Sequence, residues 1–494
     1  MGQNILEYVT ITLQTGAIIA FTIYALTVVS FIILENRSPQ STFAWILLFL
    51  VFPIGGLVIY LFFGRSWKAF SYENKLTSQE IGGDLMRVMS PRLSSEQDVI
   101  EQLAREKPAS YRRRLLELVS RNSHAALTGH NQLELLQNAT AKYPRLLRDL
   151  QQAQHSIHLE YYIWTDDDFT RQIKKTLIDR AKAGVEVRCL YDASGGKLGK
   201  AYLQELRQAG VQIHPYRPYW SIFKLHTINY RSHRKIAVID GQIGYVGGLN
   251  LDKDQLDGGP HFDYWRDTHL RLQGEAVNIL QAIFVTSWYN TTGDKLSAEP
   301  YFPNMSETIT NFLPVQITIS GPDSRWGAIR QLYFYMILSA EKTVYIQSPF
   351  FIPDESINEA LKAAALAGVD VKMMAAPRGT TYSIPYWAAN TYFYELARAG
   401  VRIFLYQKGY FHPKTLNIDS GVCSIGTANM DIRSFSINYE VNAVIYDEET
   451  AQQLEQDFLD DLQYCTEFDP EEYKKRHVLI RFRDSLARLA SPIL

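Results

Sequence analysis

Two copies of one polar motif carry the side chains with the clearest capacity for chemistry in this sequence. Each copy holds a histidine, a lysine two residues later, an aspartate, a glycine-containing turn and an asparagine. The members are His233, Lys235, Asp240 and Asn250 in the first copy and His412, Lys414, Asp419 and Asn429 in the second. Each member of the second copy lies 179 positions after its counterpart, as 412 minus 233 gives. An imidazole, an ammonium group and a carboxamide gathered in one patch suit a phosphate ligand.

The repetition distinguishes this motif from a chance arrangement. A lone histidine and lysine on a strand most often belong to a solvated edge, whereas here the same polar types persist while the residues between them differ. We count Asp240 and Asp419 with the catalytic motif. Each is followed by a turn signal, Gly241 or Ser420 with Gly421, so we interpret both aspartates as structural supports.

The segments around the motif predict the elements that position it. Residues 156–163 and 343–350 are β-branched and aromatic runs typical of buried strands, and each precedes a helical stretch and an Ala-Gly-Val step into a further strand. Alternate residues of a strand share a face. We therefore expect His233 and Lys235 to point the same way, and His412 and Lys414 likewise. Alternating strands and helices predict an α/β fold with mixed, largely parallel sheets flanked by helices, in two pseudo-symmetric domains.

Length and charge narrow the class of protein. The chain has 494 residues, 46% of them apolar, and its 50 basic and 52 acidic residues exclude the broad basic surface that a nucleic-acid binder needs. Three scattered cysteines do not make a disulfide framework. We predict a hairpin at 1–66, a linker at 67–110, a first domain at 111–310 and a second at 311–494.

The N-terminal segment predicts a transmembrane hairpin. Its spans are expected at about 9–34 and 43–63, each long enough for the roughly 20 residues that a bilayer crossing needs. Arg65 and Lys68 follow the second span, which places the catalytic domains in the cytoplasm. The expected location is therefore the inner membrane, with a multi-pass anchor. The tail 474–483 mixes basic and apolar residues and predicts an amphipathic helix, packed on the sheet or lying on an anionic membrane.

The motif, with its flanking stretches 232–236, 265–269 and 428–435, resembles the phospholipase D superfamily and, within it, the bacterial cardiolipin synthases. Across nearly the whole chain, the resemblance implies two phospholipase D-like α/β domains behind a membrane hairpin. It implies transfer of a phosphatidyl group from one phosphatidylglycerol to another, giving cardiolipin and glycerol, without a metal or cofactor.

The same resemblance implies roles for the individual residues. One histidine attacks phosphorus and the other acts as acid and base; we assign these roles to His233 and His412, with the reverse assignment open. The lysines and asparagines hold the phosphate oxygens. By family position, a carboxylate orients each histidine: Asp267, counted from His233, and Glu440, counted from His412.

Other functions remain open at this stage. A phospholipase D-type hydrolase, or a transphosphatidylase of another glycerophospholipid, would use the same residues with a different acceptor. A nuclease is disfavoured by the balanced charge, and a non-catalytic scaffold by two complete motifs. Phosphatidylethanolamine as a co-substrate, and the oligomeric state, are not determined by the sequence.

Overall fold

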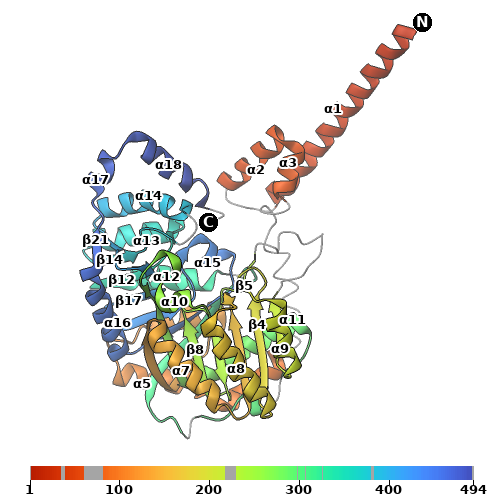
Figure 1. The fold of residues 1–494 in the computed structure, drawn as a ribbon. Helices are drawn as coiled ribbons and strands as arrows, with labels where there is room; N and C mark the ends of the chain where they lie inside the picture. The colour runs from red at the N-terminus through yellow and green to blue at the C-terminus, as the bar shows by residue number, and fades with distance from the viewer. Residues whose placement is uncertain are drawn as a thin grey trace. The chain divides into compact units, whose positions relative to one another are not determined.

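The computed structural model describes residues 2–34, 39–60, 82–216, 230–296, 299–305, 308–324, 326–379 and 383–491. The chain divides into two compact units, which we describe separately. The first contains α1 (Gly2–Leu34), α2 (Pro39–Val51) and α3 (Pro53–Ile59). The second contains the remaining described elements (Figure 1).

The N-terminal unit differs from the predicted hairpin. The second predicted span is divided, because α2 ends at Val51 and Pro53 begins α3. Proline has no backbone N–H and its ring obstructs the preceding helical turn. The end of that span, from residue 61, lies outside the described residues, as do Arg65 and Lys68. Within the described ranges, no helix has both the length and the apolar character needed to cross a bilayer, so the structure does not support the two predicted membrane spans.

A mixed sheet forms the centre of the second unit. Its described strands number 15. Those of the first half are β1 (Leu127–Gln137), β2 (Ser156–Tyr161), β4 (Glu186–Asp192), β6 (Gln212–Tyr216), β7 (Ile236–Ile239), β8 (Ile243–Gly247) and β10 (Thr268–Gly274). Those of the second half are β11 (Phe312–Ser320), β12 (Thr343–Ser348), β14 (Asp370–Ala375), β15 (Arg402–Tyr406), β17 (Thr415–Ile418), β18 (Val422–Gly426), β20 (Glu440–Ile445) and β21 (Cys465–Glu467).

The two halves follow the same strand order outward from the middle of the sheet. The first half runs β1-β10-β8-β7-β2-β4-β6, and the second runs β11-β20-β18-β17-β12-β14-β15, with β21 at its edge. Antiparallel pairing of β1 with β11 joins them into one sheet. The prediction of largely parallel sheets is wrong, because only four of the 14 described pairings in this sheet are parallel. The motif strands form antiparallel hairpins, which the strand and helix alternation did not reveal.

Helices cover both faces of this sheet (Figure 1). Alternate residues of β7 demonstrate the two layers: Ala237 and Ile239 pack in one core cluster, and Ile236 and Val238 pack in another. The first cluster contains residues of α7 (Asn138–Gln152), α8 (Asp168–Lys182) and α9 (Lys200–Gln208). The second spans both halves and contains residues of α11 (Glu275–Thr292) and α16 (Glu448–Asp461). The motif strands are therefore held rigidly from both sides.

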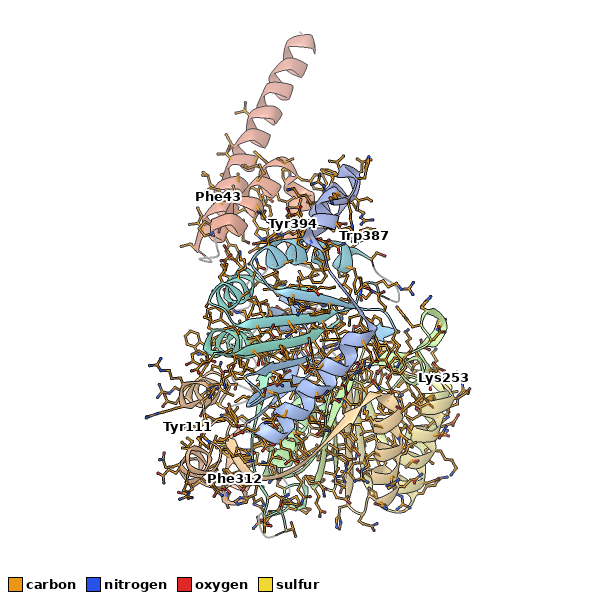
Figure 2. The ribbon with its side chains drawn as sticks, turned by 90° about the vertical axis from the view of Figure 1, so that its left-hand side faces the viewer. Phe43, Tyr111, Lys253, Phe312, Trp387 and Tyr394 are labelled. Atoms are coloured by element: carbon orange, nitrogen blue, oxygen red, sulfur yellow. The ribbon has the colours of Figure 1, made fainter. Side chains whose placement is uncertain are left out.

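The remaining described helices complete the layers. The second half has its own core with α5 (Glu96–Glu106), α6 (Arg113–Ser123), α12 (Ala328–Ser339), α13 (Glu355–Leu366) and α14 (Ile384–Arg398). Val99 and Leu103 of α5, in the segment predicted as a linker, are buried in that core. Near the chain's end lie α17 (Pro470–Lys475) and α18 (Val478–Arg488), and α18 packs on α14. Figure 2 labels Trp387 and Tyr394 on α14, and the Arg483 guanidinium of α18 lies 4.5 Å from the Trp387 ring.

Candidate active site

Backbone pairing between the two halves brings both motif histidines together. Each histidine lies three residues before its motif strand: β7 begins at Ile236 and β17 begins at Thr415. The His233 amide donates to the Tyr439 carbonyl at 2.9 Å, next to a parallel bridge between Ser232 and Tyr439. In the same way, β16 (Tyr410–Phe411) pairs with β9 (Trp265–Arg266), and the His412 amide donates to the Arg266 carbonyl at 2.8 Å. Each histidine therefore lies beside a segment of the opposite half.

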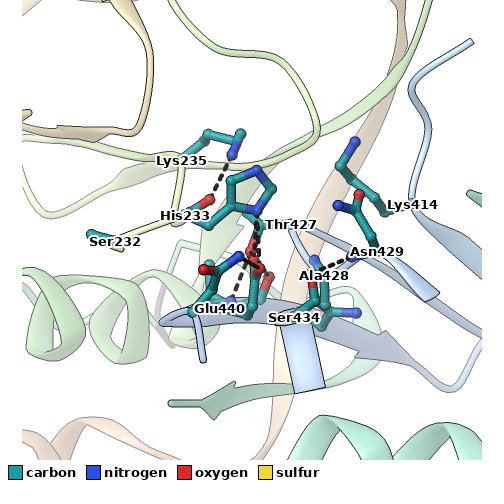
Figure 3. Close-up of polar contacts among 12 residues, drawn as sticks. Ser232, His233, Lys235, Lys414, Thr427, Ala428, Asn429, Ser434 and Glu440 are labelled. Atoms are coloured by element: carbon teal, nitrogen blue, oxygen red, sulfur yellow. Dashed lines mark hydrogen bonds and ion pairs between the residues drawn. The ribbon is translucent and has the colours of Figure 1, made fainter. Parts of the chain in front are cut away.

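This exchange decides which carboxylate holds which histidine. His233 Nδ1 lies 2.9 Å from Glu440 Oε2, and His412 Nδ1 lies 2.7 Å from Asp267 Oδ2. Distance along the chain predicted that each carboxylate orients the histidine of its own half, and that pairing is wrong. A carboxylate only accepts, so each Nδ1 carries the hydrogen and each Nε2 keeps a lone pair. Figure 3 shows the His233 ring beside Glu440.

Each orienting carboxylate is itself held in place. Glu440 is fully buried and accepts from Thr427 Oγ1 at 2.6 Å and from Asn438 Nδ2 at 3.3 Å. Asp267 is also fully buried and accepts from the Thr268 amide at 2.8 Å. These bonds leave the carboxylates little freedom, and they fix the histidine rings in turn.

The lysines fold back toward the histidine backbones. Lys235 Nζ donates to the His233 carbonyl at 2.6 Å, and Lys414 Nζ donates to the His412 carbonyl at 2.5 Å. Both ammonium groups are buried, and Lys414 lies near enough to destabilise the charge of Lys235. Figure 3 shows Lys414 and Asn429 across the site from His233.

The charged groups of this site are poorly solvated because they are buried. Burial, and then repulsion by Lys414, lower the pKa of Lys235 to about 7, while burial lowers the pKa of Lys414 to about 8. Burial lowers the pKa of His412 to about 3 and lowers that of His233 as well, so both imidazoles are neutral near pH 7. A bound phosphate diester would supply the negative charge that restores full protonation of the lysines.

The two asparagines are positioned by residues that the sequence analysis did not single out. The backbone N–H of Asn250 donates to Gln255 Oε1 at 2.7 Å, and the backbone N–H of Asn429 donates to Ser434 Oγ at 3.2 Å. Gln255 and Ser434 are also 179 positions apart, so the repeat contained a signal for them. The Ile163 amide donates to Asn250 Oδ1 at 3.0 Å, which directs the Asn250 NH₂ group away from that contact.

The motif aspartates do not line the site. Asp240 and Asp419 occupy the turns of the two motif hairpins in left-handed backbone conformations, with φ of 53° and 52°. Asp240 accepts from the amides of three consecutive residues, 154–156, and Asp419 accepts from those of 341–343. Their side chains tie each hairpin turn to the start of β2 or β12.

The histidines and asparagines line one cavity of about 530 Å³. Polar side chains at its wall include Tyr162, Arg231, Arg433 and Asn438, and aromatic ones include Trp265, Phe350, Tyr386 and Tyr410. The described residues contain no group of three or more His, Cys, Asp and Glu side chains able to hold a metal ion. The arrangement can therefore bind a phosphate diester between two neutral imidazoles, with two lysines for charge and an apolar wall for the organic part.

Comparison with known proteins identifies the family of this site. Residues 146–279 and 333–462 each match the family described as "Cardiolipin synthase, PLD-like domain". Residues 20–65 match the family described as "Phospholipase_D-nuclease N-terminal". The two longer matches contain both motif histidines and both orienting carboxylates.

Two similar sequences and one similar structure place the chain further. The cardiolipin synthase of Geobacillus kaustophilus is 41% identical over 463 residues, 93% of this chain and 90% of the relative. "Cardiolipin synthase 2" of Bacillus cereus is 40% identical over 475 residues, 96% of this chain and 91% of the relative. The crystal structure of phosphatidylserine synthase from Haemophilus influenzae shares the fold, with a TM-score of 0.59 at 12% identity, over 77% of this chain and 99% of that one.

These matches confirm the resemblance that the duplicated motif indicated, since they extend over nearly the full length of the chain and of the relatives. Together with the paired histidines in one cavity, they show an enzyme that transfers phosphatidyl groups. The chain belongs to the cardiolipin synthases of the phospholipase D superfamily.

Proposed function

We propose that this enzyme joins two phosphatidylglycerol molecules into cardiolipin and glycerol through a covalent phosphohistidine. The observation that carries the proposal is the geometry of the histidines. Each presents a free Nε2 lone pair to the same cavity and holds Nδ1–H against its own buried carboxylate. One imidazole can therefore attack while the other transfers a proton.

In the first half-reaction, His233 Nε2 attacks the phosphorus of the donor lipid. The P–N bond forms, and the bond from phosphorus to the oxygen of the head-group glycerol breaks. His412 protonates this departing oxygen, so free glycerol leaves and the phosphatidyl group stays on His233. The negative phosphodiester favours the protonated form of His412 that this step requires. Lys235 and Lys414, with the asparagine amides, stabilise the charge on the non-bridging oxygens as the pentavalent transition state forms.

In the second half-reaction, His412 is neutral and takes the proton from the hydroxyl of an incoming phosphatidylglycerol. The acceptor oxygen forms a bond to phosphorus, the P–N bond breaks, and His233 is regenerated. The near-symmetry of the site makes the assignment of the nucleophile a matter for experiment. Rapid denaturation of a single turnover at neutral to mildly alkaline pH, where the P–N bond survives, followed by mass spectrometry, will locate the phosphatidyl group on His233 or His412.

Product analysis tests the overall reaction. Purified full-length enzyme is incubated with phosphatidylglycerol vesicles, and the lipids are separated. Cardiolipin with equimolar glycerol supports the proposal, whereas phosphatidic acid as the main product indicates a hydrolase. Both His233→Ala and His412→Ala should abolish product formation, and near-normal cardiolipin synthesis by either variant contradicts the two-histidine mechanism.

We further propose that the enzyme works on the cytoplasmic face of the inner membrane. The apolar N-terminal segment supports a membrane location, and α18 supplies a second contact. Its exposed apolar residues are Val478, Leu479, Phe482 and Leu486, and basic residues at 474–476, 481 and 483 accompany them. Exposed apolar side chains on α18, with basic side chains on α18 and at the end of α17, suit an anionic lipid surface, where each cation contributes about 1 kcal/mol.

Vesicle sedimentation tests the contribution of α18. The double variant Leu479→Glu, Phe482→Glu should bind phosphatidylglycerol vesicles more weakly than wild type. Leu338→Glu, at an exposed leucine near the end of α12, is the matched control. Equal loss in both variants would show that apolar surface in general, and not α18, determines binding.

A further inference from the structure

The two walls of the catalytic cavity differ in charge although the repeat makes the catalytic groups equivalent. Arg231 and Arg433 both line the cavity. Their counterparts at a distance of 179 positions are Tyr410 and Asp254. Tyr410 is an aromatic wall residue, and Asp254 is exposed outside the cavity lining. Two guanidinium groups therefore occur on one side of a pseudo-symmetric site without equivalents on the other.

The arginines gather near His233. The ring of Tyr162 lies 5.0 Å from the His233 ring, and the charges of both arginines act on the Tyr162 hydroxyl. Burial is the main cause that lowers the pKa of Arg433, and Arg231 adds to it by like-charge repulsion. The guanidinium groups therefore lie close together in a partly desolvated place.

Acidic side chains also lie near the two arginines. Asp431, which also lines the cavity, acts electrostatically on Arg433, and it caps α15 (Ile432–Ser436) by accepting from the Ser434 amide. Burial raises the pKa of Asp431 to about 6, so this carboxyl group is still mostly ionised at pH 7. Glu440 is engaged by His233. Among the described residues that line the cavity, the two arginines outnumber the carboxylates, of which Asp431 is the only one.

The chemistry of the second half-reaction requires such a second cationic group. When the acceptor phosphatidylglycerol attacks, the phosphoryl group on His233 already occupies the lysines. The acceptor carries its own phosphate one glycerol unit away from the attacking hydroxyl, inside the same cavity. A buried anion is costly unless it is paired, and a pair of arginines matches a phosphate by forked hydrogen bonds.

We propose that Arg231 and Arg433 form the acceptor subsite, where they bind the phosphate of the incoming lipid and, after transfer, the second phosphate of cardiolipin. This inference rests on the proposed function. It makes the enzyme selective for an anionic acceptor: a neutral alcohol reaches the phosphohistidine without help from the arginines. The aromatic wall beside His412, where Trp265 and Tyr410 flank the ring at 5.5 and 5.7 Å, lacks this charge.

Acceptor competition tests the subsite. The full-length enzyme is given phosphatidylglycerol as donor together with two competing acceptors, phosphatidylglycerol itself and a neutral monoacylglycerol. The ratio of cardiolipin to the neutral transfer product depends only on the second half-reaction, because both products arise from the same phosphohistidine. Arg231→Gln and Arg433→Gln should each lower this ratio about tenfold, the value of one lost charge-assisted hydrogen bond.

Matched variants separate the subsite from general damage. Arg105→Gln, at an exposed arginine of α5 outside the cavity lining, should leave the ratio unchanged. Arg433→Lys keeps the charge and should recover part of the preference. A variant that is only unstable would form less of both products at a constant ratio.

Three results overturn the inference. In the first, the ratio stays at the wild-type value in both glutamine variants. In the second, the two products fall together, which would mean that the arginines bind the donor phosphate or only stabilise the fold. In the third, wild-type enzyme makes the neutral product but no cardiolipin, which would contradict the proposed function itself. That last result is distinguishable because it appears before any variant is made.

Discussion

Replacing Glu440 with glutamine should disable His233 while leaving the shape of the site intact. The carboxylate is fully buried and lies 2.9 Å from His233 Nδ1. Glutamine keeps one oxygen but replaces the other with an NH₂ group. Whichever oxygen is replaced, the NH₂ group then faces a group that donates to Glu440 in the wild type, either the Thr427 hydroxyl or the Asn438 side-chain amide. If its NH₂ group turns to His233, it favours the tautomer with hydrogen on Nε2, which cannot attack phosphorus.

The expected loss follows from two terms. A charge-assisted hydrogen bond between buried groups contributes about 1.5 to 3 kcal/mol, which corresponds to roughly 10- to 100-fold in rate. Stabilisation of the wrong tautomer adds to this, as shown by the loss of about 10⁴-fold in kcat when the analogous carboxylate of a serine protease triad becomes an amide. We expect Glu440→Gln to lower kcat by about 10² to 10⁴.

The assay measures both rate and location. Initial rates of cardiolipin formation give kcat, and nitrogen NMR of labelled histidines reports which ring changes its tautomer. Glu440→Gln should perturb the resonances of His233, and Asp267→Asn should perturb those of His412. The crossed pairing is refuted if Glu440→Gln perturbs His412 alone, or if its kcat equals that of wild type.

Further predictions address the lysines, the glycine beside Asp267 and the hairpin turn. Since the pKa of Lys235 is about 7 and that of Lys414 about 8, vanadate should inhibit most strongly below these values and progressively less as pH rises from about 6 to about 9; inhibition that strengthens with pH would contradict this sign. Gly248→Ala sets a methyl group 2.0 Å from Asp267 Oδ1, so the carboxylate must move and kcat should fall about 10²-fold with the fold retained by circular dichroism. Asp419→Asn weakens the bonds to three backbone amides and should reduce the free energy of unfolding by about 1 to 3 kcal/mol, seen as faster thermal inactivation at similar initial turnover. A chelator should leave cardiolipin synthesis intact, because lysines supply the positive charge; a loss that added metal reverses would disprove this.

The repeat made much of the site predictable. A spacing of 179 residues identified both histidines, both lysines and both asparagines, and the structure gathers the histidines and asparagines around one cavity with the lysines beside them. The turn signals after Asp240 and Asp419 indicated their place in the hairpins. These features are local: they depend on residue type, short spacing and the geometry of one strand and its turn.

Other features were out of reach because they depend on contacts between distant segments. Strand direction in the sheet follows from which strands become neighbours, so the strand and helix pattern overestimated parallel pairing. The arginine pair was invisible in the sequence, since Arg231 and Arg433 are about two hundred positions apart and have no repeat partners.

The sequence alone predicted which side chains gather at the site, because one motif occurs twice with the same residue types and the same spacing. Only the tertiary structure decided how those groups are divided between the halves. Pairing of β16 with β9, and of Ser232 with Tyr439, carries each histidine to the opposite half. Each carboxylate therefore orients the histidine that is farther from it in the chain. The hydrogen-bonded histidine and carboxylate always come from different halves. The physical reason is that hydrogen bonding across an interface depends on distance in space, which spacing along the chain does not encode.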